Sequence, residues 1–133
     1  MILLDTHALV WWLADPAQLP APLRRQLDLR VETGERVLAS AISAWEIAML
    51  VDRGRLELTM SPAAWVAKAT ALPFVEFVPV DPEIAVASVT LPAFPHRDPA
   101  DRIIAATALR AGAILATADE RMRGYAPLRT LWN

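Results

Sequence analysis

The sequence has no cysteine, only four glycines and a single lysine, Lys68. Without cysteine, disulfides and thiolate metal sites are excluded, and a disulfide-stapled extracellular domain is disfavoured. No glycine-rich phosphate loop, dinucleotide fingerprint or serine elbow occurs. No apolar run approaches the roughly 20 residues of a membrane span, and residues 1–4 lack the basic leader of a signal peptide. We therefore expect a cytoplasmic protein, with nucleophilic and organic-cofactor chemistry disfavoured.

The length and the charge balance limit the options further. A chain of 133 residues suits one domain with a substantial core and is too short for two ordinary ones. Hydrophobic residues make up 55% of it, a surplus that is typical of proteins that bury surface against a partner. The net charge is −2, but with four candidate site carboxylates set aside, 11 acidic residues oppose 13 basic ones. Nearly all the basic residues are arginine, which favours bidentate phosphate contacts, although a compositional bias would give the same pattern.

Short apolar segments alternate with longer, helix-like ones along the chain. We predict strands over residues 2–4, 36–39, 74–80, 113–116 and 128–131. The predicted helices cover residues 8–14, 20–32, 40–52, 61–72, 81–90, 98–111 and 119–123, several of them opened by a cap residue and a proline. Strands that alternate with helices need right-handed crossovers, which predicts a mainly parallel sheet with helices on both faces.

Four carboxylates lie in apolar surroundings where solubility does not require them: Asp5, Glu46, Asp101 and Asp119. Asp5 and Asp119 follow apolar strands, at the edge where parallel sheets bind ligands. Glu46 and Asp101 lie in helices that start from that edge, so all four can converge. Clustered carboxylates destabilise a fold unless a cation compensates them, and Mg²⁺ or Mn²⁺ prefers oxygen ligands of this kind. The set predicts a divalent metal site.

Each of these carboxylates also has a purely structural interpretation. Asp5 and Asp119 fit helix N-caps, and Glu46 fits a capping box with the serine three residues before it. Asp101 suits the positive end of a helix dipole. Asp98, directly before a proline, is an ordinary N-cap, so we rank it below Asp101 as a ligand. Singly, each residue is ambiguous, and only the set points to a site.

The aromatic residues indicate possible contact surfaces. Trp11 and Trp12 are adjacent, so on a helix they are about 100° apart and one can face away from the core. An exposed apolar patch around Trp12 would suit a dimer or a partner protein, and burial of both rings is the alternative. We expect Trp45 in the core. His7 and His96 lack the spacing of a metal pair, and we expect His7 to pack or hydrogen-bond near the site.

Four segments carry a more specific pattern: MILLDTH at residues 1–7, SAWEI at 43–47, HRDPADRIIAA at 96–106 and TADER at 117–121. In this order and spacing they resemble PIN-domain proteins of the VapC toxin type over the whole chain. The resemblance implies one PIN domain, residues 1–133, with a three-layer α/β/α fold and about five short, mostly parallel strands. By motif match the family's acidic site residues fall on Asp5, Glu46, Asp101 and Asp119. Residues that would support the site or position the substrate are Thr6, Thr117, Asp98 and Arg102.

The resemblance also implies an activity. Such proteins are Mg²⁺- or Mn²⁺-dependent endoribonucleases that hydrolyse RNA phosphodiester bonds with metal-activated water. They are toxins neutralised by a cognate antitoxin, and they commonly form dimers. We therefore expect an RNA substrate, an antitoxin and a second copy of the chain as partners.

Two alternatives to this activity remain. A phosphoacceptor receiver domain also clusters aspartates beside a parallel sheet, but it needs a lysine at the site and Lys68 lies in the wrong part of the chain. A catalytically silent PIN-like module that binds RNA or protein would retain the fold and lose acidic residues. Here all four are present, which favours an enzyme.

Overall fold

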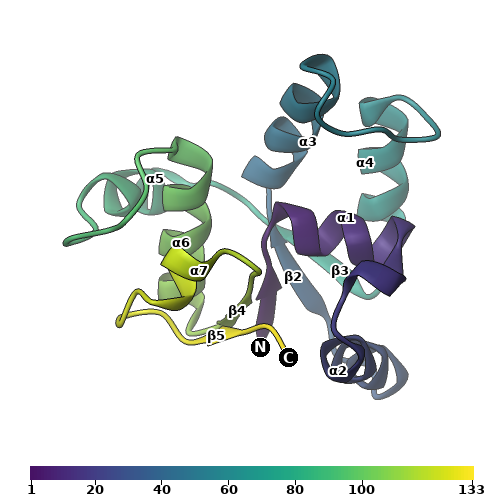
Figure 1. Cartoon of the computed structure of the whole chain (residues 1–133), viewed down its shortest axis with the longest axis horizontal. Coiled ribbons are helices and arrows are strands. Elements are labelled where there is room, and N and C mark those ends of the chain that lie inside the picture. The colour runs from purple at the N-terminus through teal and green to yellow at the C-terminus, as the bar shows by residue number, and fades with distance from the viewer.

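The structure is a computed structural model that describes all 133 residues, and its centre is a five-stranded sheet (Figure 1). The strands are Ile2–Leu4 (β1), Val37–Ser40 (β2), Val75–Val78 (β3), Ile114–Ala116 (β4) and Thr130–Leu131 (β5). Their order is β3-β2-β1-β4-β5, and every pair of neighbours is parallel. The predicted mainly parallel sheet is confirmed. Because β1 is central, the start of the chain lies between two segments made later.

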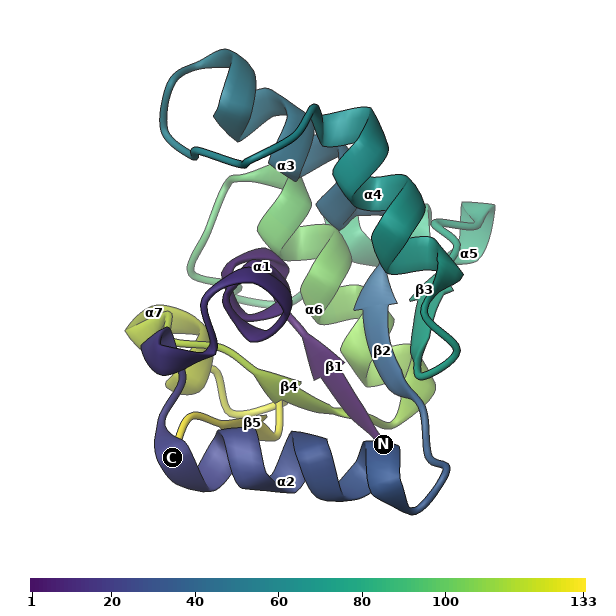
Figure 2. The same ribbon diagram turned by 90° about the vertical axis from the view of Figure 1, so that its right-hand side faces the viewer.

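Helices cover both faces of this sheet. They are Thr6–Ala14 (α1), Ala21–Glu32 (α2), Ile42–Asp52 (α3), Pro62–Ala71 (α4), Pro82–Val89 (α5), Pro99–Ala111 (α6) and Glu120–Arg123 (α7), with a 3₁₀ turn at Pro16–Gln18. In Figure 1, α1, α2 and α4 lie on one side of the sheet and α5, α6 and α7 on the other. Figure 2 shows α3 beyond the carboxyl end of β2, next to α4. No helix is long and apolar enough to cross a membrane.

Two hydrophobic cores hold the layers together. In β1, Ile2 and Leu4 belong to the core under α1 and α2, whereas Leu3 belongs to the core under α6. This alternation follows from the two-residue period of a strand. All three side chains are fully buried, which explains why β1 is a continuous apolar run.

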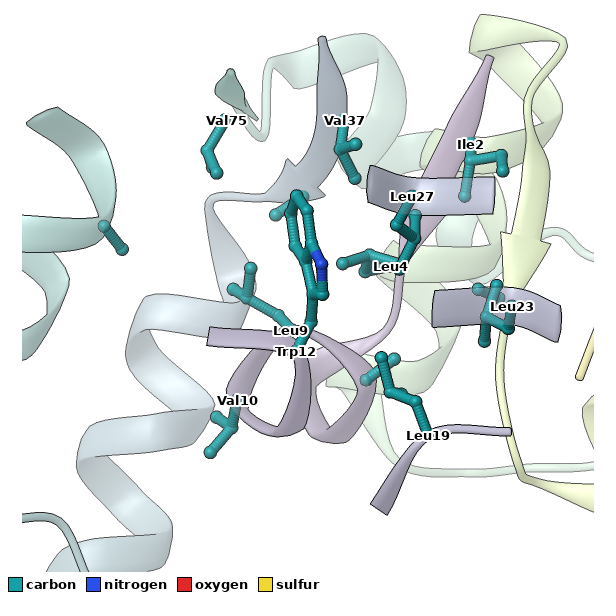
Figure 3. Packing of buried hydrophobic residues seen from close by; sticks show 14 of the residues in the cluster. Ile2, Leu4, Leu9, Val10, Trp12, Leu19, Leu23, Leu27, Val37 and Val75 are labelled. Atoms are coloured by element: carbon teal, nitrogen blue, oxygen red, sulfur yellow. The ribbon is translucent and has the colours of Figure 1, made fainter. Parts of the chain in front are cut away.

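The core under α1 is built around Trp12. Its side chain is only 8% exposed and packs edge-on against Phe74, with ring centroids 5.6 Å apart. Figure 3 shows the Trp12 ring among Leu4, Val37 and Val75. The proposed exposed patch around Trp12 is therefore wrong, because this ring, and not its neighbour Trp11, faces the sheet.

Local signals in the sequence place most helix ends. α1 begins at Thr6, two residues earlier than predicted, because the Asp5 carboxylate accepts a hydrogen bond from the Ala8 amide. α6 ends at Gly112, whose φ of 63° is left-handed and costs glycine little. Trp45 is a correction: its side chain is 54% exposed, although we expected it in the core. The helix that carries it is apolar on most sides, so its buried face is not evident from its pattern.

Candidate functional site

A cavity of about 540 Å³ lies at the carboxyl edge of the sheet. Its volume is within the usual range of ligand sites, about 300–1,000 Å³. All four predicted site carboxylates line it, and so does Asp98, which we ranked below them. The acidic lining residues are Asp5, Glu46, Asp98, Asp101 and Asp119. Residues up to 114 positions apart in sequence thus meet at the sheet edge where parallel folds bind ligands. Whether these carboxylates act as ligands depends on how each one is held.

Asp5 is fixed by both its backbone and its side chain. Its amide donates to the Ala116 carbonyl of β4 at 3.1 Å, and its Oδ1 accepts from the Ala8 amide at 2.8 Å. Burial raises the pKa of Asp5, and the Glu46 carboxylate raises it further. The Thr117 hydroxyl, the Ala8 amide and His7 lower that pKa without cancelling the effect of burial. Asp5 is therefore a helix cap and also a rigid carboxylate short of positive charge.

Glu46 is buried in α3, with a side chain only 8% exposed. The capping box suggested by Ser43 and Glu46 does not form, because α3 begins after Ala41, which makes no side-chain cap. Instead, the Ser43 hydroxyl lies 2.9 Å from the hydroxyl of Thr6. The Glu46 carboxylate is thus not used as a cap and lines the cavity. A buried carboxylate of this kind is costly unless a cation or hydrogen bonds compensate it.

Asp101 lies in the first turn of α6, behind the N-cap Asp98. The cap prediction for Asp98 is confirmed, because its Oδ1 accepts from the Ala100 amide at 2.9 Å. Burial raises the pKa of Asp101 to about 7, and the carboxylates of Asp98, Glu46 and Asp119 contribute to the rise. His96 lowers the pKa of Asp101 to a smaller extent. A carboxylic acid that titrates near neutral pH shows that negative charge here lacks compensation.

Asp119 uses its two carboxylate oxygens differently. Oδ1 accepts from two amides of α7 at 2.9 and 3.1 Å, so Asp119 is an N-cap. Oδ2 lies 2.7 Å from Nε2 of His96. His96, Asp101 and Asp119 each offer a ligand atom, and these atoms lie within 4.8 Å of one another. A divalent cation could be held by this group together with the carboxylates of the same cavity.

His96 lies at the site, although it was not predicted there from the sequence. The loop before α6 brings it there: Ala93 has a positive φ of 54°, and Phe94 packs against Tyr125 with centroids 5.1 Å apart. His96 is then 6.0 Å from the Phe94 ring. Its signals in the sequence were its place at the start of the segment 96–106 and its position two residues before the cap Asp98, and neither specifies a loop conformation.

The remaining predicted site residues lie in different places. Thr6 lines the cavity, and the fully buried Thr117 accepts from the Asp119 amide at 3.1 Å. Arg102 does not line the cavity; it donates to a carbonyl of α5 at 3.2 Å and lies 5.6 Å from the centroid of the Phe94 ring. The arginine that lines the cavity is Arg55, which was not predicted from the sequence.

Comparison with known proteins adds to this geometry. The family model described as the PIN domain matches residues 2–127. The chain belongs to the PIN-domain family. This PIN domain is similar to Ribonuclease VapC22 of Mycobacterium tuberculosis, with 33% identity over 133 residues and 98% of each chain covered. The resemblance stated from the four sequence segments is confirmed.

Solved structures show the same PIN fold. VapBC2 of Rickettsia felis, bound to a DNA fragment from its promoter, contains a chain that superposes with a TM-score of 0.72 at 16% identity, with both chains fully covered. FitAcB of Neisseria gonorrhoeae gives a TM-score of 0.67 at 23% identity, covering 100% of this chain and 97% of the other. The three-layer α/β/α arrangement expected for a PIN domain is therefore confirmed.

Proposed function

We propose that residues 1–133 form one PIN domain that acts as a metal-dependent endoribonuclease toxin of the VapC type. The observation that carries the proposal is the convergence of Asp5, Glu46, Asp101 and Asp119 on one cavity. The similarity to Ribonuclease VapC22 over 98% of each chain supports the same activity. Because RNA is the substrate, we place the protein in the cytoplasm.

The residues of the cavity fit Mg²⁺ or Mn²⁺. Every carboxylate donor is a hard oxygen, as these ions require. The raised pKa values of Asp5 and Asp101 indicate negative charge that a divalent cation would stabilise. We assign Asp5 and Asp101 as principal ligands, and Glu46 and Asp119 as ligands that act directly or through water.

When bound, the metal would lower the pKa of water and offset the charge of the scissile phosphodiester. The protein's own residues fix the geometry. The Ala8 amide and the Thr117 hydroxyl orient Asp5, while α7 amides and His96 orient Asp119. In such hydrolysis, water would add to phosphorus in line as the bond from phosphorus to the 3′ oxygen breaks. The 3′ oxygen would gain a proton in exchange for the one that the water loses, so the products would carry a 5′-phosphate and a 3′-hydroxyl.

We also propose two protein partners, a cognate antitoxin and a second copy of the chain. Several large apolar side chains remain exposed and are available for such contacts: Leu29, Trp45, Val86, Val89 and Leu109. The solved relatives include a toxin-antitoxin complex from Klebsiella pneumoniae, which covers 96% of this chain at 19% identity. A catalytically silent module that binds RNA or protein is the second candidate, and the complete set of lining carboxylates disfavours it.

One experiment tests the activity directly. Metal-free protein is incubated with total RNA, with and without Mg²⁺ or Mn²⁺, and the new 5′ ends are mapped. We expect discrete, metal-dependent cuts that are absent from an Asp5→Asn preparation. RNA that stays intact under all conditions, with the wild-type protein folded, would overturn the ribonuclease proposal and favour the binding module.

A further inference from the structure

The cavity has a second kind of wall beside its carboxylates. His7, Trp11, Met49, Leu50 and Arg55 line the same cavity as the acidic residues. Arg55 is the only arginine or lysine among the lining residues. An aromatic and cationic surface is not needed to hold a metal ion, so this wall requires a separate explanation.

Trp11 is held in place, yet it remains accessible from the cavity. Its ring lies 5.6 Å from the imidazole of His7, one helical turn earlier, and 5.9 Å from the ring of Trp132. Trp11 is only half-buried and His7 is exposed, whereas the neighbouring Trp12 is packed into the core. Thus one tryptophan of the pair is buried in the core, and the other lines the cavity.

Arg55 has a fixed backbone and a free guanidinium. Its amide donates to the Leu50 carbonyl at 2.8 Å, in a turn where Gly54 adopts a φ of 70°. The salt bridges of the protein involve Arg30, Arg36, Arg110 and His96, and none of them includes Arg55. An exposed, unpaired arginine next to a strongly acidic cavity can offset the repulsion between the carboxylates of the cavity and a polyanion.

We propose that Trp11 and His7 form a stacking surface for an unpaired base of the substrate, and that Arg55 binds a phosphate beside it. This inference rests on the ribonuclease function proposed above and assigns the side chains that would contact an unpaired base and its phosphate. A base within a duplex has both faces covered by its neighbours, so it cannot stack on a protein ring. Stacking of bases on aromatic side chains tolerates any sequence, and arginine contributes the salt-dependent part of binding.

Binding of a fluorescein-labelled single-stranded RNA, measured by anisotropy in EDTA, tests the surface without hydrolysis. We expect Trp11→Ala to weaken binding roughly tenfold and Trp11→Phe to retain most of it. Arg55→Gln should weaken binding and lower the slope of log K against log salt by about 0.7. The matched control for Arg55 is Arg25→Gln, which changes an exposed arginine outside the cavity, and Trp11→Phe is the control for Trp11. Thermal melting verifies that each variant is folded.

An RNA series with single abasic positions then identifies the stacked base. In the wild type, one abasic position near the cut should raise KM roughly tenfold, and in Trp11→Ala the same change should have no further effect. Equal effects in both proteins, or an unchanged KM for Trp11→Ala and Arg55→Gln, would overturn the stacking proposal while cleavage continues. Efficient cutting of a fully paired duplex would overturn it as well. If the wild type cuts no RNA, the ribonuclease proposal itself fails.

Discussion

The hydroxyls of Thr6 and Ser43 lie 2.9 Å apart, although 37 residues separate them in sequence. Both side chains are buried, with 2% and 0% exposure. This hydrogen bond joins the first residue of α1 to the first turn of α3. Asp5 directly precedes one of these helices and Glu46 lies in the other, so the bond also sets the spacing of two site carboxylates.

We expect Thr6→Val to lower the free energy of unfolding by about 1–2 kcal/mol, because the buried Ser43 hydroxyl loses its partner. Ser43→Ala in the same background should recover part of that loss. Urea unfolding of the wild type, both single variants and the double variant gives the coupling energy. A coupling energy near zero would show that the two hydroxyls are independent.

Asp5→Asn should reduce RNA cleavage at least 100-fold and leave the fold intact, because asparagine caps a helix nearly as well as aspartate. The matched control is Asp81→Asn, since Asp81 caps α5 through the same 2.8 Å bond to a backbone amide and lies outside the cavity. Cleavage rates and circular dichroism of both variants provide the measurement. Full activity of Asp5→Asn would refute the proposed role of Asp5 as a metal ligand.

Asp101 should make the metal-free protein less stable as pH rises. Its pKa is about 7 in the folded state, well above the ordinary aspartate value of about 3.9, so the folded state binds the proton more tightly. Its contribution to stability is therefore lost between about pH 4 and pH 7. We expect Asp101→Asn to be more stable than the wild type by roughly 2 kcal/mol at pH 8, and equal at pH 4. Urea unfolding in EDTA across this range measures the difference, and a constant difference at all pH values would contradict it.

Millimolar Mg²⁺ should raise the melting temperature at pH 8, because the cation relieves repulsion among the carboxylates that line the cavity. A concentration of 100 times Kd adds about 2.7 kcal/mol of stability. The increase should become smaller in Asp101→Asn and also in wild type below pH 6, where protons compete with the metal. Calorimetry in Mg²⁺ against NaCl of equal ionic strength measures it. An unchanged melting temperature counts against the site.

Two tryptophans of opposite burial should respond differently to truncation. Trp12→Ala should cost about 3–5 kcal/mol, because it removes an 8% exposed ring from the core. Trp45→Ala should change stability by less than about 0.5 kcal/mol, since its side chain is 54% exposed. Denaturant unfolding of the two variants provides the comparison. Similar losses in both would contradict the burial of Trp12.

Most helices and strands could be predicted from the sequence because the signals that mark them are local. A cap residue followed by proline marks the starts of α5 and α6, and Gly112 marks the end of α6. The ends of strands are harder to predict: β3 was predicted over residues 74–80 and spans Val75–Val78. Strand ends depend on pairing with a neighbour, and β3 pairs only with β2. The crossover rules predicted that the strands are parallel, but they did not predict the order of the strands in the sheet.

The site was predictable where topology determines position. Carboxylates that follow strands or begin helices at one sheet edge meet there whatever the details of packing. The position of His96 depends on the conformation of a loop, and that of Arg55 depends on a turn. The exposure of Trp45 depends on which face of its helix is buried. The sequence carries no periodic signal for any of these. Arg102 was favoured because it lies in a motif, but its guanidinium is used within the fold.

The central position of β1 has a consequence for synthesis on the ribosome. Ile2 pairs with Ile114, so the strand that emerges first waits for one of its two neighbours until nearly the whole domain has been made. Until then, the nascent chain carries Asp5, Glu46 and Asp101 but lacks Asp119, which follows β4. A chain interrupted before β4 lacks one of the four site carboxylates and has an open strand edge at β1. The proposed ribonuclease site is therefore complete only after translation of the domain is almost finished.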